Sequence, residues 1–299
     1  MTALPPPPLP AWLSEQLPFE RRVVDVDGRR IHVMEQGQGR PVLLLHGNPT
    51  WGFLWRKVAS ALSGAPLRLV MPDLLGLGYS DRLASSAEHS IGLHSAAISG
   101  VIEALELEDL ILVGQDWGGP IGLHALSRTP GRMAGLVLLN TVVGPPKPGF
   151  KPTAFHRFSR LPVLSELCFR LLGFPQRALH VAQGDRGSID RATRRAYLHP
   201  LRGLRNNRAP LALARMVPDR LDHPSIPELA RCQLFAEGFE GPKALVWGER
   251  DPVLGRLRRR VERSLPGAEV TLTRGGHFLQ EEEPEAIAAA ISKVSARLG

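Results

Sequence analysis

The stretch Gly114-Gln115-Asp116-Trp117-Gly118-Gly119 decides the fold prediction. It follows an apolar run at residues 110–113, typical of a buried strand, and precedes a helical periodicity at residues 121–128. Gly-x-Asp-x-Gly between a strand and a helix is the pattern of a nucleophile elbow, with aspartate at the nucleophile position. The sharp turn lifts Asp116 above the sheet, near the positive end of the following helix. Alone, the pattern also fits an ordinary turn with a helix N-cap, so its context must decide.

Segments with strand-like and helix-like patterns alternate on both sides of this stretch. A β-hairpin is predicted at residues 22–26 and 30–35, joined by the turn dipeptide Asp27-Gly28. The run Val42-Leu43-Leu44-Leu45 is apolar throughout, as expected of a strand buried on both faces. Further strands are predicted at residues 68–71, 110–113, 135–139, 243–247 and 269–273, and helices at residues 53–62, 93–105 and 121–128. The alternation predicts an α/β fold with a mostly parallel central sheet flanked by helices.

The segment of residues 146–240 breaks this alternation. It begins within the turn-forming stretch Gly144-Pro145-Pro146-Lys147-Pro148-Gly149, contains helical pieces separated by prolines, and includes no convincing strand. We therefore expect a helical cap inserted between two strands. The predicted core consists of residues 1–145 and 241–299, and a chain of 299 residues is long enough for one such domain with an insertion.

Two further loops supply the context that the stretch around Asp116 needs. His46-Gly47-Asn48-Pro49-Thr50-Trp51 directly follows the apolar strand, where an α/β-hydrolase provides the second backbone N–H of its oxyanion hole. Gly275-Gly276-His277-Phe278 follows the last predicted strand, where that fold carries its catalytic histidine. The sequence thus predicts an α/β-hydrolase fold with Asp116 as nucleophile and His277 as base. We also expect a cis peptide bond between Asn48 and Pro49, because this loop must turn sharply toward Asp116.

The acid of the catalytic triad is assigned to Asp251. It lies in Gly248-Glu249-Arg250-Asp251-Pro252, after the predicted strand at residues 243–247, so that the chain order is nucleophile, acid, base. The rival position, at the end of the preceding strand, holds Asn140, which cannot ionise. A serine esterase is excluded because no serine occupies the elbow.

With these motifs assembled, the chain resembles the haloalkane dehalogenases over nearly its whole length. The resemblance rests on Gly-Gln-Asp-Trp-Gly-Gly, His-Gly-Asn-Pro-Thr-Trp, Gly-Glu-Arg-Asp-Pro-Val-Leu-Gly and Gly-His-Phe-Leu-Gln-Glu-Glu. It implies hydrolysis of haloalkanes to alcohol and halide through a covalent ester of Asp116, with no cofactor and no metal. The expected partners are therefore a small halogenated aliphatic substrate, water and the halide product.

The resemblance also implies a pair of halide ligands. In that family the tryptophan after the nucleophile, here Trp117, grips the leaving halide with its indole N–H. The second donor is either an asparagine after His-Gly or a tryptophan of the cap. Since the predicted cap contains no tryptophan, Asn48 is the expected second ligand. The chain then resembles the subfamily that combines an Asp-His-Asp triad with an Asn-Trp halide pair.

The chemistry favours these groups independently of the family. A carbon–halogen bond has no carbonyl to polarise, so catalysis must help the halide to leave. The carboxylate of Asp116 can attack the carbon in line while two N–H donors receive the developing charge, each contributing roughly 3 kcal/mol by analogy with oxyanion donors. His277, held by Asp251, can then activate water to hydrolyse the ester.

Other functions remain open at this point. An epoxide hydrolase shares the fold and the aspartate nucleophile but needs acidic cap groups, usually two tyrosines. The predicted cap has only Tyr197, and Tyr79 is expected in the core. A fluoroacetate-type haloacid dehalogenase could use the cap arginines as carboxylate anchors, although it would lean on a cap tryptophan that is missing here. A non-catalytic ligand receptor on the same fold would have no use for an intact triad.

Composition narrows the remaining classes. The net charge of +8 comes entirely from residues 146–240, which hold sixteen Lys and Arg against eight Asp and Glu. These are mostly single arginines with few aromatic neighbours, so nucleic-acid binding is not expected. Cys168 and Cys232 are expected to be free thiols, and the proline-rich N-terminus to form an extended arm rather than a secretory signal. With no apolar run long enough to cross a membrane, a cytoplasmic location is expected, while the oligomeric state stays open.

Overall fold

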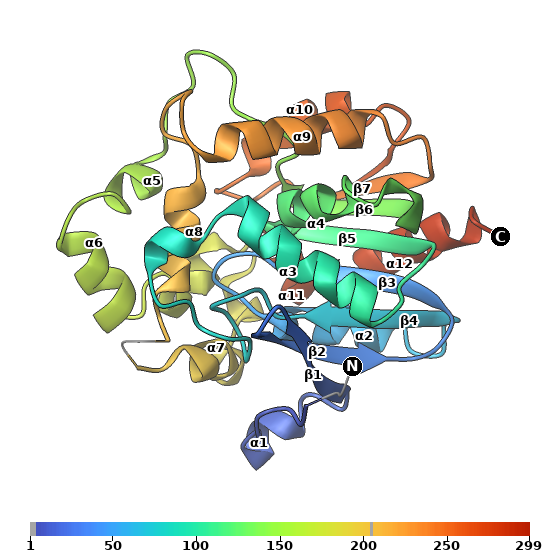
Figure 1. Ribbon diagram of the computed structural model, residues 1–299, viewed down its shortest axis with the longest axis horizontal. Helices are drawn as coiled ribbons and strands as arrows, with labels where there is room; N and C mark the ends of the chain where they lie inside the picture. The colour runs from blue at the N-terminus through green and yellow to red at the C-terminus, as the bar shows by residue number, and fades with distance from the viewer. Residues whose placement is uncertain (1–3, 204–205) are drawn as a thin grey trace.

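A single mixed sheet organises the chain in the computed structural model, which describes residues 4–203 and 206–299 (Figure 1). Within these residues the strand order is β1-β2-β4-β3-β5-β6-β7-β8. The strands β1 and β2 form an antiparallel hairpin, β2 pairs antiparallel with β4, and all other pairs are parallel. The bounds are β1 Glu20–Val26, β2 Arg29–Gln36, β3 Arg40–Leu45, β4 Leu67–Pro72, β5 Leu110–Asp116, β6 Met133–Thr141, β7 Lys243–Gly248 and β8 Glu269–Thr273. The predicted α/β fold, including its hairpin, is confirmed.

Helices cover both faces of the sheet, as the alternation predicted. One layer contains α3 (Ile91–Ala104), α4 (Gly118–Leu126), α9 (Ser225–Glu237) and α10 (Arg258–Ser264), and the other contains α2 (Arg56–Ala61) and α12 (Pro284–Ala296) (Figure 1). The strand β3 shows why its sequence is apolar throughout. Its residues Leu43 and Leu45 pack in the first layer's cluster, whereas Val42 and Leu44 pack in the second, because successive side chains of a strand point to opposite faces.

The chain between β6 and β7, residues 142–242, forms an inserted segment that contains no strand in its described part. Besides α9 it holds the short helices α5 (Ala154–Phe158), α6 (Leu164–Glu166), α7 (Arg191–Leu198) and α8 (Ala209–Met216), which lie to one side of the sheet in Figure 1. The division into core and cap at residues 145/146 and 240/241 stays a prediction. The packing of α9 against α4 and α3 is a feature that it did not foresee.

The N-terminal arm runs beside the hairpin. Leu4 forms a β-bridge with Val23, and the short helix α1 (Ala11–Ser14) follows Pro10, where only an extended arm was predicted. The first three residues of that arm lie outside the described residues. Among the helices that the structure describes, none has the length and apolar character needed to cross a membrane. The short helix α11 (Leu279–Glu282) leads from the last strand's loop into α12.

Candidate active site

The elbow at Asp116 has the geometry that its sequence predicts. The strand β5 ends at Asp116, whose φ of 49° lies in the left-handed region, and α4 begins two residues later at Gly118. A non-glycine residue with positive φ is strained and is held by the surrounding structure. Gly118 is required here because a Cβ at this position would collide with the carbonyl oxygen of Leu45. The turn therefore places the Asp116 side chain beyond the carboxyl end of the sheet.

The Asp116 carboxylate is poorly solvated and accepts backbone hydrogen bonds. Its Oδ1 accepts the Asn48 N–H at 2.8 Å, and the Trp117 N–H also contributes. Burial raises the pKa of Asp116 above its ordinary value, while His277 and these two N–H groups work in the opposite direction. A weakly hydrated carboxylate of raised pKa is a better nucleophile than one in water.

His277 bridges two carboxylates. Its Nδ1 lies 3.0 Å from Oδ2 of Asp251, and its Nε2 lies 3.7 Å from Oδ2 of Asp116. The other oxygen of Asp251 accepts the backbone N–H groups of Val253 and Leu254 at 2.6 and 3.1 Å, which fixes the carboxylate. Burial lowers the pKa of His277, but the charges of Asp251 and Asp116 outweigh it, so the net pKa is raised. The structure thus brings the three residues of the expected triad together.

The loop that carries His277 is held from three sides. Asn140, at the end of β6, donates to the Gly276 carbonyl at 2.7 Å and accepts the Gly248 N–H at 3.0 Å. Ala182 of the inserted segment accepts the His277 N–H at 2.8 Å, and the Gln115 amide donates to the His277 carbonyl at 3.2 Å. In the sequence, Asn140 was notable only because it stands at a position where the triad acid could have been. A polar residue at the end of an apolar strand was the signal for this positioning role.

The loop after β3 also has the expected geometry, and its Asn48–Pro49 bond is cis, as predicted. Gly47 is needed because a Cβ there would collide with the Asp116 side chain. The Asn48 side-chain amide donates to the Pro210 carbonyl of α8 at 3.0 Å, which uses one of its two hydrogens. Trp117 lines the pocket next to Asp116 and is almost fully buried. Both expected halide ligands are therefore adjacent to Asp116, and Asn48 is oriented by the inserted segment.

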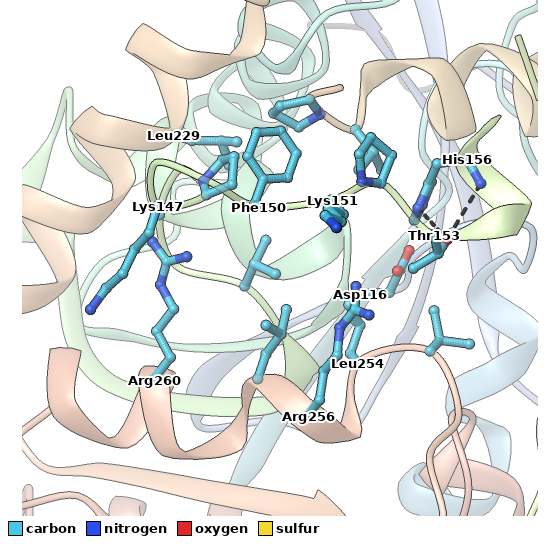
Figure 2. A pocket seen from close by; sticks show the side chains of 18 of the residues that line it. Asp116, Lys147, Phe150, Lys151, Thr153, His156, Leu229, Leu254, Arg256 and Arg260 are labelled. Carbon is cyan, nitrogen blue, oxygen red and sulfur yellow. Dashed lines mark hydrogen bonds between the residues drawn. The ribbon is translucent and has the colours of Figure 1, made fainter. Parts of the chain in front are cut away.

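A cavity of about 630 Å³ opens above Asp116 and Trp117 (Figure 2). Its walls are mostly apolar and come from the inserted segment and from the stretch after β7, with Val142, Phe150, Val217, Leu229, Val253, Leu254 and Leu257 among them. This size falls in the usual range for small-molecule sites. An apolar cavity with one carboxylate at its base suits an alkyl substrate that is attacked at one carbon.

Comparisons with known proteins agree with this geometry. Residues 40–284 match the family model for the alpha/beta hydrolase fold. The haloalkane dehalogenase 2 of Mycobacterium tuberculosis is 33% identical over 279 residues, covering 92% of this chain and 94% of its own. The haloalkane dehalogenase of Mycobacterium marinum is 32% identical over 288 residues, with 92% and 93% covered. The chain belongs to the haloalkane dehalogenase family.

Solved structures give the same assignment. The haloalkane dehalogenase DatA of Agrobacterium tumefaciens superposes with a TM-score of 0.83 at 25% identity, covering 94% of this chain and 97% of that one. The chain of 299 residues is therefore an enzyme that hydrolyses carbon–halogen bonds of haloalkanes. The suspected family, the fold class and the enzyme class from the sequence are confirmed.

The positions of the two tyrosines fit a haloalkane dehalogenase better than an epoxide hydrolase. Tyr197 is fully buried, and its hydroxyl donates to Glu281 at 2.6 Å. Tyr79 lies outside the inserted segment and is partly buried, and its hydroxyl lies 2.9 Å from Nδ1 of His199 in that segment. Neither lines the cavity above Asp116. The cavity therefore has no tyrosine to protonate an epoxide oxygen.

No group of His, Cys, Asp and Glu able to hold a metal ion occurs among residues 4–203 and 206–299. The pocket also contains a set of side chains that the sequence did not point to, namely the cations Lys147, Lys151, Arg256 and Arg260. No sequence motif predicts that they lie together, because they come from two segments that are distant in sequence and adjacent only in the fold.

Proposed function

We propose that this haloalkane dehalogenase works through a covalent alkyl ester of Asp116, with His277 and Asp251 completing the triad and with Asn48 and Trp117 as halide ligands. The observation that carries the proposal is the chain of contacts from Asp251 through His277 to Asp116 at the base of an apolar cavity. No cofactor takes part in this scheme.

In the first step the substrate's halogen-bearing carbon faces Asp116. The carboxylate forms a C–O bond as the carbon–halogen bond breaks, and the halide leaves with the bonding electron pair. The indole N–H of Trp117 and the second amide hydrogen of Asn48 receive the halide's charge. The Pro210 carbonyl, which accepts the other Asn48 hydrogen at 3.0 Å, holds the amide in a fixed orientation. Donors that are already oriented cost no reorganisation when the charge develops.

In the second step water hydrolyses the ester. His277 accepts a proton from the water, which attacks the ester carbonyl carbon, and the alcohol then leaves while the Asp116 carboxylate is restored. The backbone N–H of Asn48, which already donates to Asp116, and that of Trp117 stabilise the oxyanion. Asp251 keeps Nδ1 of His277 protonated, so that Nε2 is free to act as the base.

The variant His277→Phe tests the two-step scheme. Attack on the haloalkane needs no base, whereas hydrolysis of the ester does, so the variant should stop after the first step. Mass spectrometry of His277→Phe mixed with 1-bromohexane should detect the protein plus one hexyl group, together with one equivalent of bromide. The double variant Asp116→Asn/His277→Phe is the matched control and should gain no mass. A variant that binds substrate but forms no adduct would contradict the covalent scheme.

A further inference from the structure

The cavity above Asp116 changes character between its base and its mouth. At the base, Asp116 and Trp117 are largely buried, and the middle is walled by apolar side chains. Toward solvent the lining includes Lys147, Lys151 and Arg256, which are exposed, and the partly buried Arg260. The cavity therefore has an apolar interior and a cationic mouth.

The cations of the mouth come from opposite walls. Lys147 and Lys151 belong to the loop that follows β6. Arg256 lies just before α10, and Arg260 lies within it (Figure 2). Charged side chains on one surface helix are usually just solvated, but here two segments over a hundred residues apart direct like charges to one opening. Like charges that surround one opening repel each other, and an anion between them would relieve this repulsion.

Carboxylates do not balance this charge. Asp116, at the base, is the one acidic residue among the described residues that line the cavity. Within the described part of the chain, no carboxylate lies within ion-pair distance of Lys147, Lys151 or Arg256, while the nearby Arg160 and Arg258 are paired with Asp219 and Glu262. Arg260 donates to the Pro145 carbonyl and so keeps most of its donors free.

The pKa of His156 is affected by the positive charges near the cavity. It also lines the cavity, and its Nδ1 lies 2.7 Å from the Thr153 hydroxyl (Figure 2). Burial and the charges of Arg160 and Arg256 lower the pKa of His156 to about 4. His156 is therefore neutral at pH 7, and the positive charge of the mouth belongs to the lysines and arginines.

We propose that the preferred substrates are haloalkanes whose far end carries an anionic group, such as ω-halocarboxylates, with the halogen at Asp116 and the anion bound between Lys147, Lys151 and Arg256. The proposal rests on the proposed role of Asp116. Displacement and ester hydrolysis then give the ω-hydroxycarboxylate, a halide ion and one proton, without any further reactant. A haloacid with the halogen next to its carboxylate would be too short to reach both ends of the cavity.

The experiment compares 6-bromohexanoate with 1-bromohexane, which lacks the anion. The anion stays at the mouth in both the ground state and the transition state, so it should lower KM and leave kcat almost unchanged. Three exposed ion pairs predict a kcat/KM about tenfold higher for the carboxylate, falling as salt is added. A series from bromoacetate to longer ω-bromocarboxylates should show the advantage only once the chain reaches the mouth.

Charge-removing variants assign the effect. In Lys147→Gln/Lys151→Gln/Arg256→Gln the ratio of kcat/KM for the two substrates should fall toward one. Arg259→Gln is the matched control, since Arg259, which lies in α10 three residues after Arg256, is an exposed arginine that does not line the cavity. Its ratio should equal that of the wild type. If the triple variant folds poorly, the single variant Arg256→Gln is used, together with inhibition of 1-bromohexane turnover by hexanoate and by neutral hexanamide.

The outcomes separate this inference from the mechanism. Turnover of 1-bromohexane without any preference for 6-bromohexanoate overturns the inference and leaves the role of Asp116 intact. A preference that survives in the triple variant, or that is greatest for bromoacetate, also overturns it. Absence of turnover with every substrate would contradict the proposed function itself. A salt-sensitive preference that disappears in the triple variant but not in Arg259→Gln supports the inference.

Discussion

The sheet and the inserted segment of residues 142–242 are stabilised in different ways. The strands β3 and β5 are buried between two large clusters that span both helix layers. In its described part, the inserted segment has only a small cluster of its own, formed by Phe169, Leu211 and Ala214, and exposes several leucines between residues 161 and 172. Its other buried side chains, such as Leu213 and Tyr197, belong to the sheet's clusters. The sheet and its helices can therefore hold the residues around Asp116 in place. The inserted segment, which forms much of the wall and part of the mouth of the cavity, is less constrained by its own packing.

Removing the proposed nucleophile gives the largest expected effect. Asp116→Asn should lower turnover by about a millionfold, the loss expected when a catalytic nucleophile is removed, because an amide is a poor nucleophile. The fold should persist, since asparagine has nearly the same volume. Halide release measures the first effect and thermal unfolding the second. Mass spectrometry must exclude deamidation back to aspartate, and wild-type-like halide release from intact protein would disprove the role of Asp116.

A pair of leucine substitutions tests the comparison of the two regions. Leu44→Ala, in β3, removes a fully buried side chain and should lower the free energy of unfolding by about 2–5 kcal/mol. Leu164→Ala, in α6, removes a side chain that is 47% exposed and should change it by about 0.5 kcal/mol or less. Urea unfolding of both variants measures the difference. Equal losses would mean that the inserted segment is packed as firmly as the sheet.

The core was also the region that the sequence predicted well. The predicted strand at residues 269–273 coincides with β8, and the others differ from the structure by a few residues at their ends. Strands buried on both faces have continuous apolar runs, so their pattern is strong. The inserted segment gave only the expectation of helices, because its elements are short and many of their buried side chains join the sheet's clusters. Which of its faces is buried is thus decided by distant residues.

The site shows the same contrast. The elbow around Asp116, the loop that contains Asn48 and the loop of His277 could be predicted because each has a local motif tied to the end of a strand. The contact of Asn48 with Pro210 and the support of His277 by Ala182 could not, since they join residues far apart in sequence. Backbone carbonyls have no sequence signature. Predicting them requires the position of the inserted segment over the sheet.

Asn48→Ala tests the contact between the sheet's loop after β3 and the inserted segment, where the Asn48 amide donates to the Pro210 carbonyl. If the Asn48 amide receives the halide, alkylation should slow by about a hundredfold, the effect of losing one oriented donor. Ester hydrolysis should change much less, because alanine retains the backbone N–H that donates to Asp116. Single-turnover kinetics with 1-bromohexane separate the two steps. Equal slowing of both, or a loss of stability alone, would mean that Asn48 only fixes its loop to Pro210.

The pH dependence of the wild-type enzyme should produce the mildest effect and separates the two steps without mutation. His277 can act as a base only when neutral, and its pKa is raised above the ordinary 6.5 because Asp251 and Asp116 outweigh burial. Ester hydrolysis should therefore slow as the pH falls through the pKa of His277, by up to about tenfold per pH unit below it. In the ester Asp116 is uncharged, so its contribution to the pKa of His277 is lost and that of Asp251 remains.

Alkylation should resist the same change in pH. It requires an ionised Asp116, and protonation of His277 3.7 Å away favours that carboxylate rather than opposing it. Between about pH 8 and about pH 5.5, single-turnover experiments should thus show nearly constant halide release and a growing fraction of alkylated protein by mass spectrometry. If both steps slowed equally, the titrating group would act on a process common to both, such as substrate binding, rather than on ester hydrolysis alone. If hydrolysis stays constant over this range, His277 is not the base. The proposed role of Asp251, which is to hold His277 for that task, would then also be wrong.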